Sequence, residues 1–157
     1  GTDCQLAIET SGHAALQENY FLDDGAYLAA KIVIKAARLK QEGRPISSVL
    51  ADLEDPADEK EVRIPIRTED FGAYGDQVLS DLKDWVKTQD GMTLTEPNYE
   101  GVRIDFGDGW CLLRKSLHDP ILPMNMASDQ EGGCQAIEKV MKSFLNQYEK
   151  LGLEGVL

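Results

Sequence analysis

The sequence predicts an α+β fold, in which an antiparallel sheet carries helices on one face and a shorter segment of different character precedes it. In the longer part, apolar and polar residues alternate in several short runs, as is typical of half-buried strands, and two further runs show helical spacing. An acidic stretch around Pro56 separates this part from the first. We therefore expect a domain boundary there, with residues 1–54 and 55–157 forming two domains.

The first part is expected to hold a strand and a helix. A strand-like run covers residues 4–8, and a polar stretch follows at residues 9–13. The helix should begin at Asp23 or Asp24, because either carboxylate can accept hydrogen bonds from unpaired backbone N–H groups, and it should end before Gly43. Leu28, Ile32 and Leu39 form one apolar stripe, and further apolar or small residues lie outside it, so we expect the helix to be packed on more than one side.

The second part begins with a strand and a helix. Alternation over residues 62–66 predicts the strand, and Pro65 places it at an edge of the sheet because proline cannot donate a ladder hydrogen bond. Apolar residues at helical spacing predict an amphipathic helix over residues 74–87, and Gly91 suits its end.

A β-hairpin and a last strand and helix should complete this part. Residues 102–106 alternate, Gly107-Asp108-Gly109 suits a tight turn, and residues 110–114 form the return strand. A further strand is expected over residues 121–126. The final helix shows apolar spacing between Glu131 near its start and Lys150 near its end, in agreement with the helix dipole.

Composition excludes several classes of partner. The formal charge of -12, from 28 acidic and 16 basic residues, argues against non-specific binding of nucleic acid or of an anionic membrane surface. No apolar run approaches the roughly 20 residues that span a bilayer. Cys4, Cys111 and Cys134 are far apart and contain no CxxC pair, which favours neither a disulfide framework nor a zinc site. We expect a cytoplasmic protein.

The first candidate site is the polar stretch Glu9-Thr10-Ser11-Gly12-His13. The Glu9 carboxylate can accept hydrogen bonds from two neighbouring sugar hydroxyls, and Ser11 can add another contact. His13 can donate to a phosphate oxygen. The alternative is a helix-capping turn whose polarity is incidental.

The second candidate site is the loop of residues 114–120, which leaves one strand and ends at Pro120. Arg114 offers a planar fork that can bind a phosphate through two hydrogen bonds. Ser116 and backbone N–H groups can add donors, and His118 can donate from the ring nitrogen, Nε2 or Nδ1, that carries a proton. The alternative is a solvated hairpin loop.

Two other patterns favour structure over chemistry. Ser116, His118 and Asp119 are too close along an extended loop to form a nucleophile-base chain, since neighbouring side chains diverge. The Asp-Gly pair at residues 108–109 is usual turn chemistry rather than a magnesium loop. The two histidines are widely separated, so a His-rich metal site is not expected, and we predict no metal ligand.

The two candidate loops resemble those of one known family. Residues 9–13, followed by Tyr20-Phe21 and by Asp23-Asp24-Gly25 opening a helix, resemble the sugar-recognition loop of the α-D-phosphohexomutases, the phosphoglucomutase/phosphomannomutase family. Further on, Gly101-Val102-Arg103 and Arg114-Lys115-Ser116 resemble the C-terminal phosphate-binding domain of that family. The resemblance covers essentially the whole chain, in order.

The resemblance implies a C-terminal part of a four-domain enzyme. Residues 1–54 would end its third, α/β domain, and residues 55–157 would form its fourth, TATA-binding-protein-like α+β domain. Members of the family are isomerases that move a phosphoryl group within a hexose phosphate through a phosphoserine, Mg²⁺ and a bisphosphorylated sugar such as glucose 1,6-bisphosphate. Neither the serine loop nor the metal loop is found here. The resemblance thus implies a phosphosugar-binding part that depends on N-terminal domains of the same chain and is inactive alone.

Site residues follow from the same resemblance, position by position. Glu9 and Ser11 would bind sugar hydroxyls, and His13 would approach the substrate phosphate. The non-reacting phosphate would be held by Arg114, Ser116 and His118. The family often has Asn and Thr where Leu117 and His118 stand here, so two loop donors are lost or changed.

Two alternatives remain open at this point. The chain could belong to a phosphoglucosamine mutase, whose sugar loop is similar, although glucose and mannose phosphates are favoured. It could also be a non-catalytic module that binds a protein through its sheet edge, which would need an exposed apolar patch.

Overall fold

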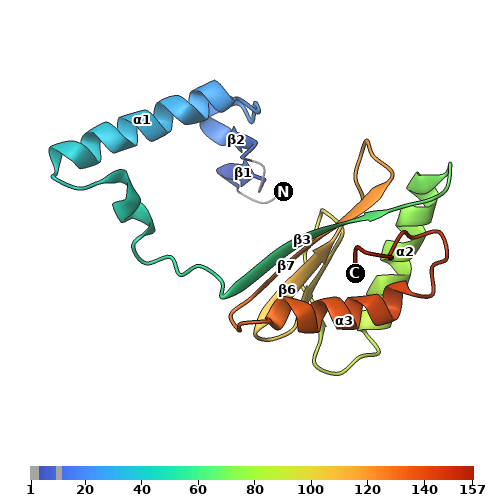
Figure 1. The fold of residues 1–157 in the computed structure, drawn as a ribbon. Coiled ribbons are helices and arrows are strands. Elements are labelled where there is room, and N and C mark those ends of the chain that lie inside the picture. The colour runs from blue at the N-terminus through green and yellow to red at the C-terminus, as the bar shows by residue number, and fades with distance from the viewer. Residues whose placement is uncertain (1–3, 10–11) are drawn as a thin grey trace. The chain divides into compact units, whose positions relative to one another are not determined.

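The computed structural model describes residues 4–9 and 12–157. It consists of two compact units, Gly1–Glu54 (unit 1) and Asp55–Leu157 (unit 2), and each is described by itself (Figure 1).

Unit 2 is built on one antiparallel sheet of five strands. Its spatial order is β3-β7-β6-β5-β4, and consecutive strands in this order are paired antiparallel. The strands are β3 (Asp58–Pro65), β4 (Thr93–Leu94), β5 (Val102–Asp105), β6 (Gly109–Leu113) and β7 (Ile121–Ser128). The predicted α+β class is confirmed, and β3, which contains Pro65, lies at an edge as predicted.

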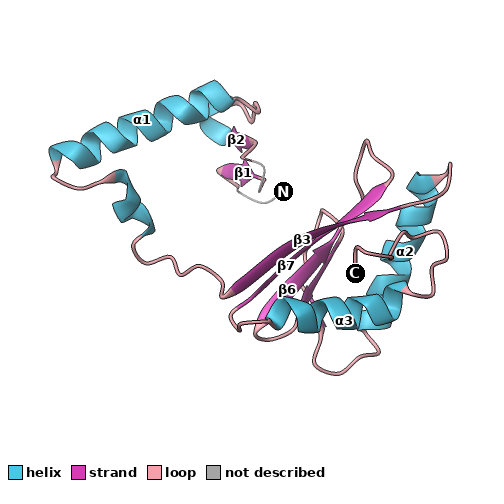
Figure 2. Ribbon diagram, in the orientation of Figure 1, coloured by secondary structure: helices cyan, strands magenta, loops and turns pink. Residues whose placement is uncertain are grey.

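Two helices cover one face of this sheet, α2 (Phe71–Val86) and α3 (Gly133–Leu145) (Figure 2). Helix α2 begins where the Asp70 carboxylate accepts a hydrogen bond from Ala73 N–H. Because strand side chains alternate, each strand sends one row of apolar residues toward the helices. These rows and the apolar faces of both helices form one core, which includes Val62, Ile64, Val78, Leu82, Ile104, Cys111, Leu122, Met124, Ile137 and Met141.

Three details of unit 2 differ from the sequence prediction. Strand β3 begins at Asp58, within the stretch that the acidic residues assigned to the linker. The short strand β4 was not predicted, because two residues are too few to show alternation. Helix α3 ends at Leu145, and Tyr148 lies beyond it, where its hydroxyl donates to Asp81 of α2 at 2.8 Å.

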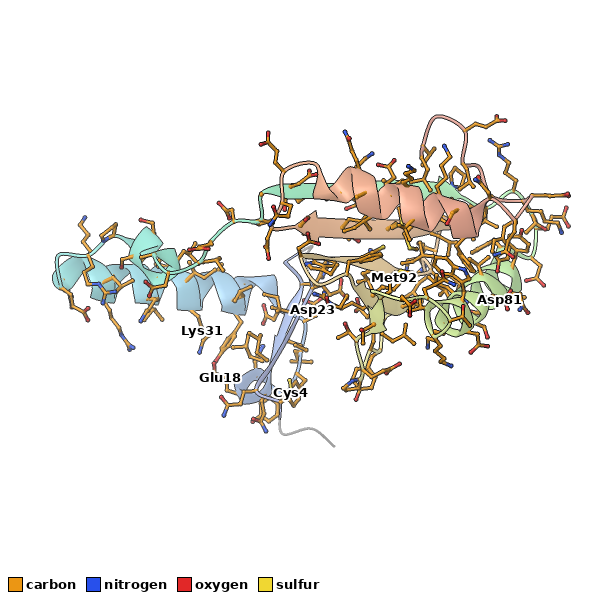
Figure 3. All side chains as sticks on the ribbon, turned by 90° about the horizontal axis from the view of Figure 1, so that it is seen from below. Cys4, Glu18, Asp23, Lys31, Asp81 and Met92 are labelled. Atoms are coloured by element: carbon orange, nitrogen blue, oxygen red, sulfur yellow. The ribbon has the colours of Figure 1, made fainter. Side chains whose placement is uncertain are left out.

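Unit 1 contains a small hairpin and a long helix. Strand β1 (Leu6–Ile8) pairs antiparallel with β2 (Ala14–Leu16), which was not predicted, and a 3-10 turn, η1 (Gln17–Asn19), follows. Helix α1 (Gly25–Gln41) leads to a second 3-10 turn, η2 (Ile46–Leu50). Lys31 of α1 forms an ion pair with Glu18 of η1, and Figure 3 shows the two side chains together.

The surface of α1 differs from what the sequence predicted. Leu39 is its buried residue, whereas Ile32, Val33 and Ile34 are 51%, 66% and 51% exposed. The expected packing on more than one side is therefore not present within unit 1. In the described part of the chain, no helix is long and apolar enough to cross a membrane.

Candidate functional site

The first candidate loop closes the β1–β2 hairpin of unit 1. Glu9 N–H donates to His13 C=O at 2.9 Å, and Gly12 N–H donates to Glu9 C=O at 3.0 Å. Gly12 has a φ of 90°, a conformation that glycine adopts at little cost. These backbone hydrogen bonds hold Glu9 beside Gly12 and His13. Ser11, predicted to bind a sugar hydroxyl, lies outside the described residues.

His13 is held by an aspartate that follows the hairpin. The His13 imidazole donates from Nδ1 to Asp23 Oδ2 at 2.6 Å, and Asp23 Oδ1 accepts from Ala14 N–H at 3.2 Å. The hydrogen bond and the negative charge of Asp23 raise the pKa of His13, and the charge of Glu9 acts in the same direction. The His13 side chain is 65% exposed. This pairing favours a protonated His13 whose Nε2–H remains a donor.

Asp23 is a residue whose role the sequence did not reveal. Both Asp23 and Asp24 were candidates for the helix cap, and the structure gives that position to Asp24, which accepts from Tyr27 N–H at 3.0 Å. Asp23 lies one residue earlier, in a β-bridge with Ala15, and is labelled in Figure 3. The sequence offered one signal for this pairing: two adjacent carboxylates, Asp23 and Asp24, with His13 ten positions before Asp23.

The second candidate loop connects β6 and β7 in unit 2. Arg114 N–H donates to Pro123 C=O at 3.0 Å and Ser116 N–H donates to Ile121 C=O at 3.2 Å, so the first part of the loop continues the ladder. The Ser116 hydroxyl oxygen accepts from the N–H groups of His118 and Asp119, at 3.4 and 3.2 Å. Because that oxygen serves as an acceptor inside the loop, its proton can be donated to a ligand.

Arg114 and Lys115 are adjacent cations in different situations. Lys115 Nζ donates to Asp76 Oδ1 at 2.6 Å and to Gly72 C=O at 3.3 Å, both on α2. Among the described residues, no hydrogen bond or ion pair engages the Arg114 guanidinium. Arg114 is therefore the cation of this loop that is available to an anion.

A glycine directly before β5 allows the backbone to approach Arg114. Gly101 has a φ of 121°, and a Cβ atom there would lie 2.9 Å from Arg114 Cα and against the carbonyl of Leu113. The other two loop residues of interest, Leu117 and His118, are exposed. The structure thus brings Arg114, Ser116 and His118 into one loop and places Glu9 and His13 in another, in a different unit.

The Asp-Gly turn between β5 and β6 has the structure that the sequence predicted for it. Phe106 N–H donates to Gly109 C=O at 2.8 Å, and Asp105 Oδ1 accepts from Gly107 N–H at 2.7 Å. In the part of the chain that the structure describes, no group of three or more His, Cys, Asp or Glu residues is placed to hold a metal ion.

Comparison with known proteins agrees with the family resemblance of the two loops. No family model matches the chain. A protein of Pseudomonas aeruginosa named phosphomannomutase/phosphoglucomutase is 31% identical over 147 residues, which is 93% of this chain and 29% of that protein. A protein of the same name from Pseudomonas putida is 29% identical over 150 residues, 94% of this chain and 30% of its own length. The chain is thus similar to these members of the phosphoglucomutase/phosphomannomutase family over nearly its whole length.

Two further proteins match over similar shares of this chain and of their own length. A phosphoglucomutase of Neisseria meningitidis is 27% identical over 151 residues, 96% of this chain and 31% of that protein. A solved structure of a phosphoglucomutase/phosphomannomutase family protein from Burkholderia thailandensis matches with a TM-score of 0.70 over 99% of this chain and 30% of its own, at 21% identity, and shows the same fold. The chain spans about 30% of the length of these relatives. The predicted resemblance to a C-terminal part of the family is confirmed.

Proposed function

We propose that the chain is the phosphosugar-binding C-terminal part of a phosphoglucomutase/phosphomannomutase. The whole enzyme would interconvert hexose 1-phosphate and hexose 6-phosphate through a phosphoserine and a bisphosphorylated sugar. The names of the relatives support this enzyme class and favour glucose and mannose phosphates over glucosamine phosphates. The reacting serine and the Mg²⁺ site would come from N-terminal domains, so this part alone would bind without catalysing.

The observation that carries the proposal is the Arg114 loop. An unengaged guanidinium and a hydroxyl proton on Ser116 lie two positions apart on a loop that backbone hydrogen bonds hold. Such donors match the three acceptor oxygens of a phosphate group. Hydrogen bonds to a charged group contribute about 1.5–3 kcal/mol each, which suffices for local binding against the acidic character of the chain. His118 would add a donor from the ring nitrogen that carries a proton.

The loop of unit 1 would contact the sugar. In the proposal, the Glu9 carboxylate and Ser11 accept and donate hydrogen bonds with ring hydroxyls, and the protonated His13 donates to the second phosphate. The support for this role is the pairing of His13 with Asp23, which favours the cationic form of the imidazole. A cation at this position attracts phosphate, whereas a neutral imidazole would only offer a weaker neutral donor.

A pair of neighbouring substitutions tests the proposal. The isotope-labelled protein is titrated with glucose 1,6-bisphosphate. The NMR chemical shifts of the backbone amides are followed in the wild type, in Arg114→Gln and in Lys115→Gln. Each variant removes one positive charge, but Lys115 is bound to Asp76 and Gly72, whereas Arg114 is available. We expect Arg114→Gln to weaken binding at least roughly tenfold and Lys115→Gln to leave it nearly unchanged.

Two results would contradict the proposal. One is saturable binding that Arg114→Gln leaves intact, because the ligand would then be held elsewhere. The other is the absence of saturable shifts at millimolar ligand while the amides of residues 114–119 are sharp and well resolved, because an ordered loop would then fail to bind.

A further inference from the structure

The face of the unit 2 sheet opposite the helices carries a row of charged residues. Val62 and Ile64 of β3 point to the core, so the pleat places Glu61 and Arg63 on the opposite face. The same alternation places Asn125 of β7 on that face, between Met124 and Met126 of the core. We refer to this side as the open face, because both helices lie on the other side (Figure 2).

Arg63 and Arg114 lie in the same row of the open face. Arg63 is the direct partner of Pro123 in the β3–β7 pair, and Arg114 donates its N–H to Pro123 C=O from the other side. One strand therefore separates the two arginines, which puts their backbones about 10 Å apart at the usual spacing of roughly 4.8 Å between strands. Pro123 between them is buried although it lies on the open face, so neighbouring side chains cover it.

The loop of residues 114–120 also acts on Arg63. The negative charge of Asp119 contributes to raising the pKa of Arg63, although hydrogen bonding to Glu61 is the main cause. Asp119 belongs to the loop, where its N–H donates to the Ser116 hydroxyl oxygen. Arg63 is therefore close enough to the loop for the charge of Asp119 to affect its pKa. The Arg63 side chain is 72% exposed.

Glu61 is a carboxylate that both arginines influence. Arg63 Nε donates to Glu61 Oε1 at 2.7 Å, and Asn125 Nδ2 donates to Glu61 Oε2 at 3.3 Å. The hydrogen bond from Arg63 lowers the pKa of Glu61, and the charge of Arg114 acts in the same direction. Glu61 is therefore ionised at neutral pH and acts on the same guanidinium groups that would bind a phosphate.

We propose that Arg63 is a second phosphate-binding arginine of the Arg114 loop and that the Glu61 carboxylate competes with the phosphate for it. This proposal rests on the proposed function and adds to it a residue from an edge strand distant in the sequence. Arg63 bound through Nε keeps its terminal N–H groups for a phosphate monoester. Two guanidinium groups around one phosphate add charge and select a dianion over a monoanionic ligand. Glu61 holds Arg63 in position and repels the phosphate, so it lowers affinity.

Opposite effects of two neighbouring substitutions test this proposal. Amide-shift titrations with inorganic phosphate and with glucose 1,6-bisphosphate at constant ionic strength are compared for the wild type, Arg63→Gln and Glu61→Gln. We expect Arg63→Gln to weaken binding about tenfold and Glu61→Gln to strengthen it severalfold. Arg63→Lys, which keeps the charge but not the fork, should fall between Arg63→Gln and the wild type.

Arg103 provides the matched control. It lies on the same open face and carries the same charge, but its guanidinium stacks on Trp110 at 4.1 Å from the ring centroid, away from the row of Arg114. Arg103→Gln should change the affinity less than twofold. Amide shifts of β3 and β7 without ligand verify that each variant keeps the sheet. If Arg63→Gln disturbs the sheet, the affinity of Arg63→Lys is compared with that of the wild type instead.

The outcomes separate the two proposals. If Arg63→Gln and Arg103→Gln weaken binding equally, the effect is the net charge of the face, and Arg63 is not a ligand residue. If Arg114→Gln abolishes binding while the Arg63 and Glu61 variants leave it unchanged, the proposed function stands and this inference is wrong. If Arg114→Gln also leaves binding unchanged, both are wrong.

Discussion

Asp23 and Asp24 are adjacent carboxylates that contact different groups. Asp24 accepts from a backbone N–H in the first turn of α1, whereas Asp23 accepts from the ring of His13 and from Ala14 N–H. The Asp23 contacts join the end of the β1–β2 hairpin to the start of the helix. The conformation of His13, a candidate phosphate donor, therefore depends on a residue that does not itself have to touch a ligand.

Replacing Asp23 should change the titration of His13. In Asp23→Asn the imidazole loses its charged partner, so the pKa of His13 should fall toward its ordinary value, as an NMR titration of the ring protons would detect. Since the native pKa is raised, the cationic form is present below that pKa and is lost as the pH rises through it. Any phosphate contact of His13 should weaken over the same range, and over a lower range in the variant.

Asp24→Asn is the control for that titration. It alters the cap of α1, and it leaves the carboxylate that binds His13 in place. Asparagine is nearly as good a cap as aspartate, so the stability of the helix should change by only a few tenths of a kcal/mol, roughly. Equal titration of His13 in both variants would show that Asp23 does not hold the imidazole in solution.

At the scale of elements, the sequence predicted what each segment forms better than which segments are neighbours. Alternation was sufficient for β3, β5, β6 and β7, and helical spacing was sufficient for α2 and most of α3. Strand β4 was missed because two residues give too few positions for a pattern, and β2 was missed because its residues, Ala-Ala-Leu, do not alternate between apolar and polar. The order of the strands cannot be read from alternation.

That limit explains why Arg63 was missed as a candidate site residue. In the sequence it is the polar member of an alternating run, with nothing to distinguish it from other surface residues. Its proximity to Arg114 arises because β3 and β6 both pair with β7, a long-range arrangement. Arg114 and Ser116 could be predicted because their loop is contiguous in the sequence.

The close approach of Gly101 to Arg114 predicts a specific loss of stability. Gly101→Ala would place a Cβ against Leu113 C=O in a conformation with positive φ, so it should lower the free energy of unfolding by more than the roughly 1–3 kcal/mol of backbone strain alone. Both tryptophans, Trp85 and Trp110, lie in unit 2, so urea denaturation followed by fluorescence reports on this unit.

Gly107→Ala separates the two causes. Gly107 also has a positive φ, 92°, but no atom lies within 4 Å of its added Cβ. The decrease in the free energy of unfolding caused by Gly107→Ala should therefore reflect backbone strain only and be smaller than that caused by Gly101→Ala. Equal losses would mean that contact with the Leu113–Arg114 backbone adds nothing.

On the scale of the molecule, the apolar core belongs to unit 2. All members of the main cluster of buried residues lie between Val62 and Leu151. The described part of unit 1 buries Ala14 and Leu39 and exposes several large apolar side chains of α1. Since burial of apolar surface is the main favourable contribution to folding, the two units should differ in stability.

Hydrogen exchange should show this difference. The amides of α1 should exchange at least a hundredfold faster than those of α3, although both are regular helices, because α3 is packed on the sheet. Comparing two helices removes the effect of secondary structure type. Equal protection of the two would indicate that unit 1 buries its apolar surface in solution, against this chain or a second copy, and the measurement should then be repeated at several concentrations.

The pairing of β3 with β7 also bears on the order of events during synthesis. β3 is the first strand of unit 2 to be made, yet its partner in the sheet is the last, and α2 and the other three strands lie between them in the sequence. Such long-range pairing slows folding, because the intervening chain must be closed into a loop first. A ribosome that has released only residues up to Leu113 would expose β3 with no strand to pair with, so unit 2 completes its sheet only after Ser128 has emerged.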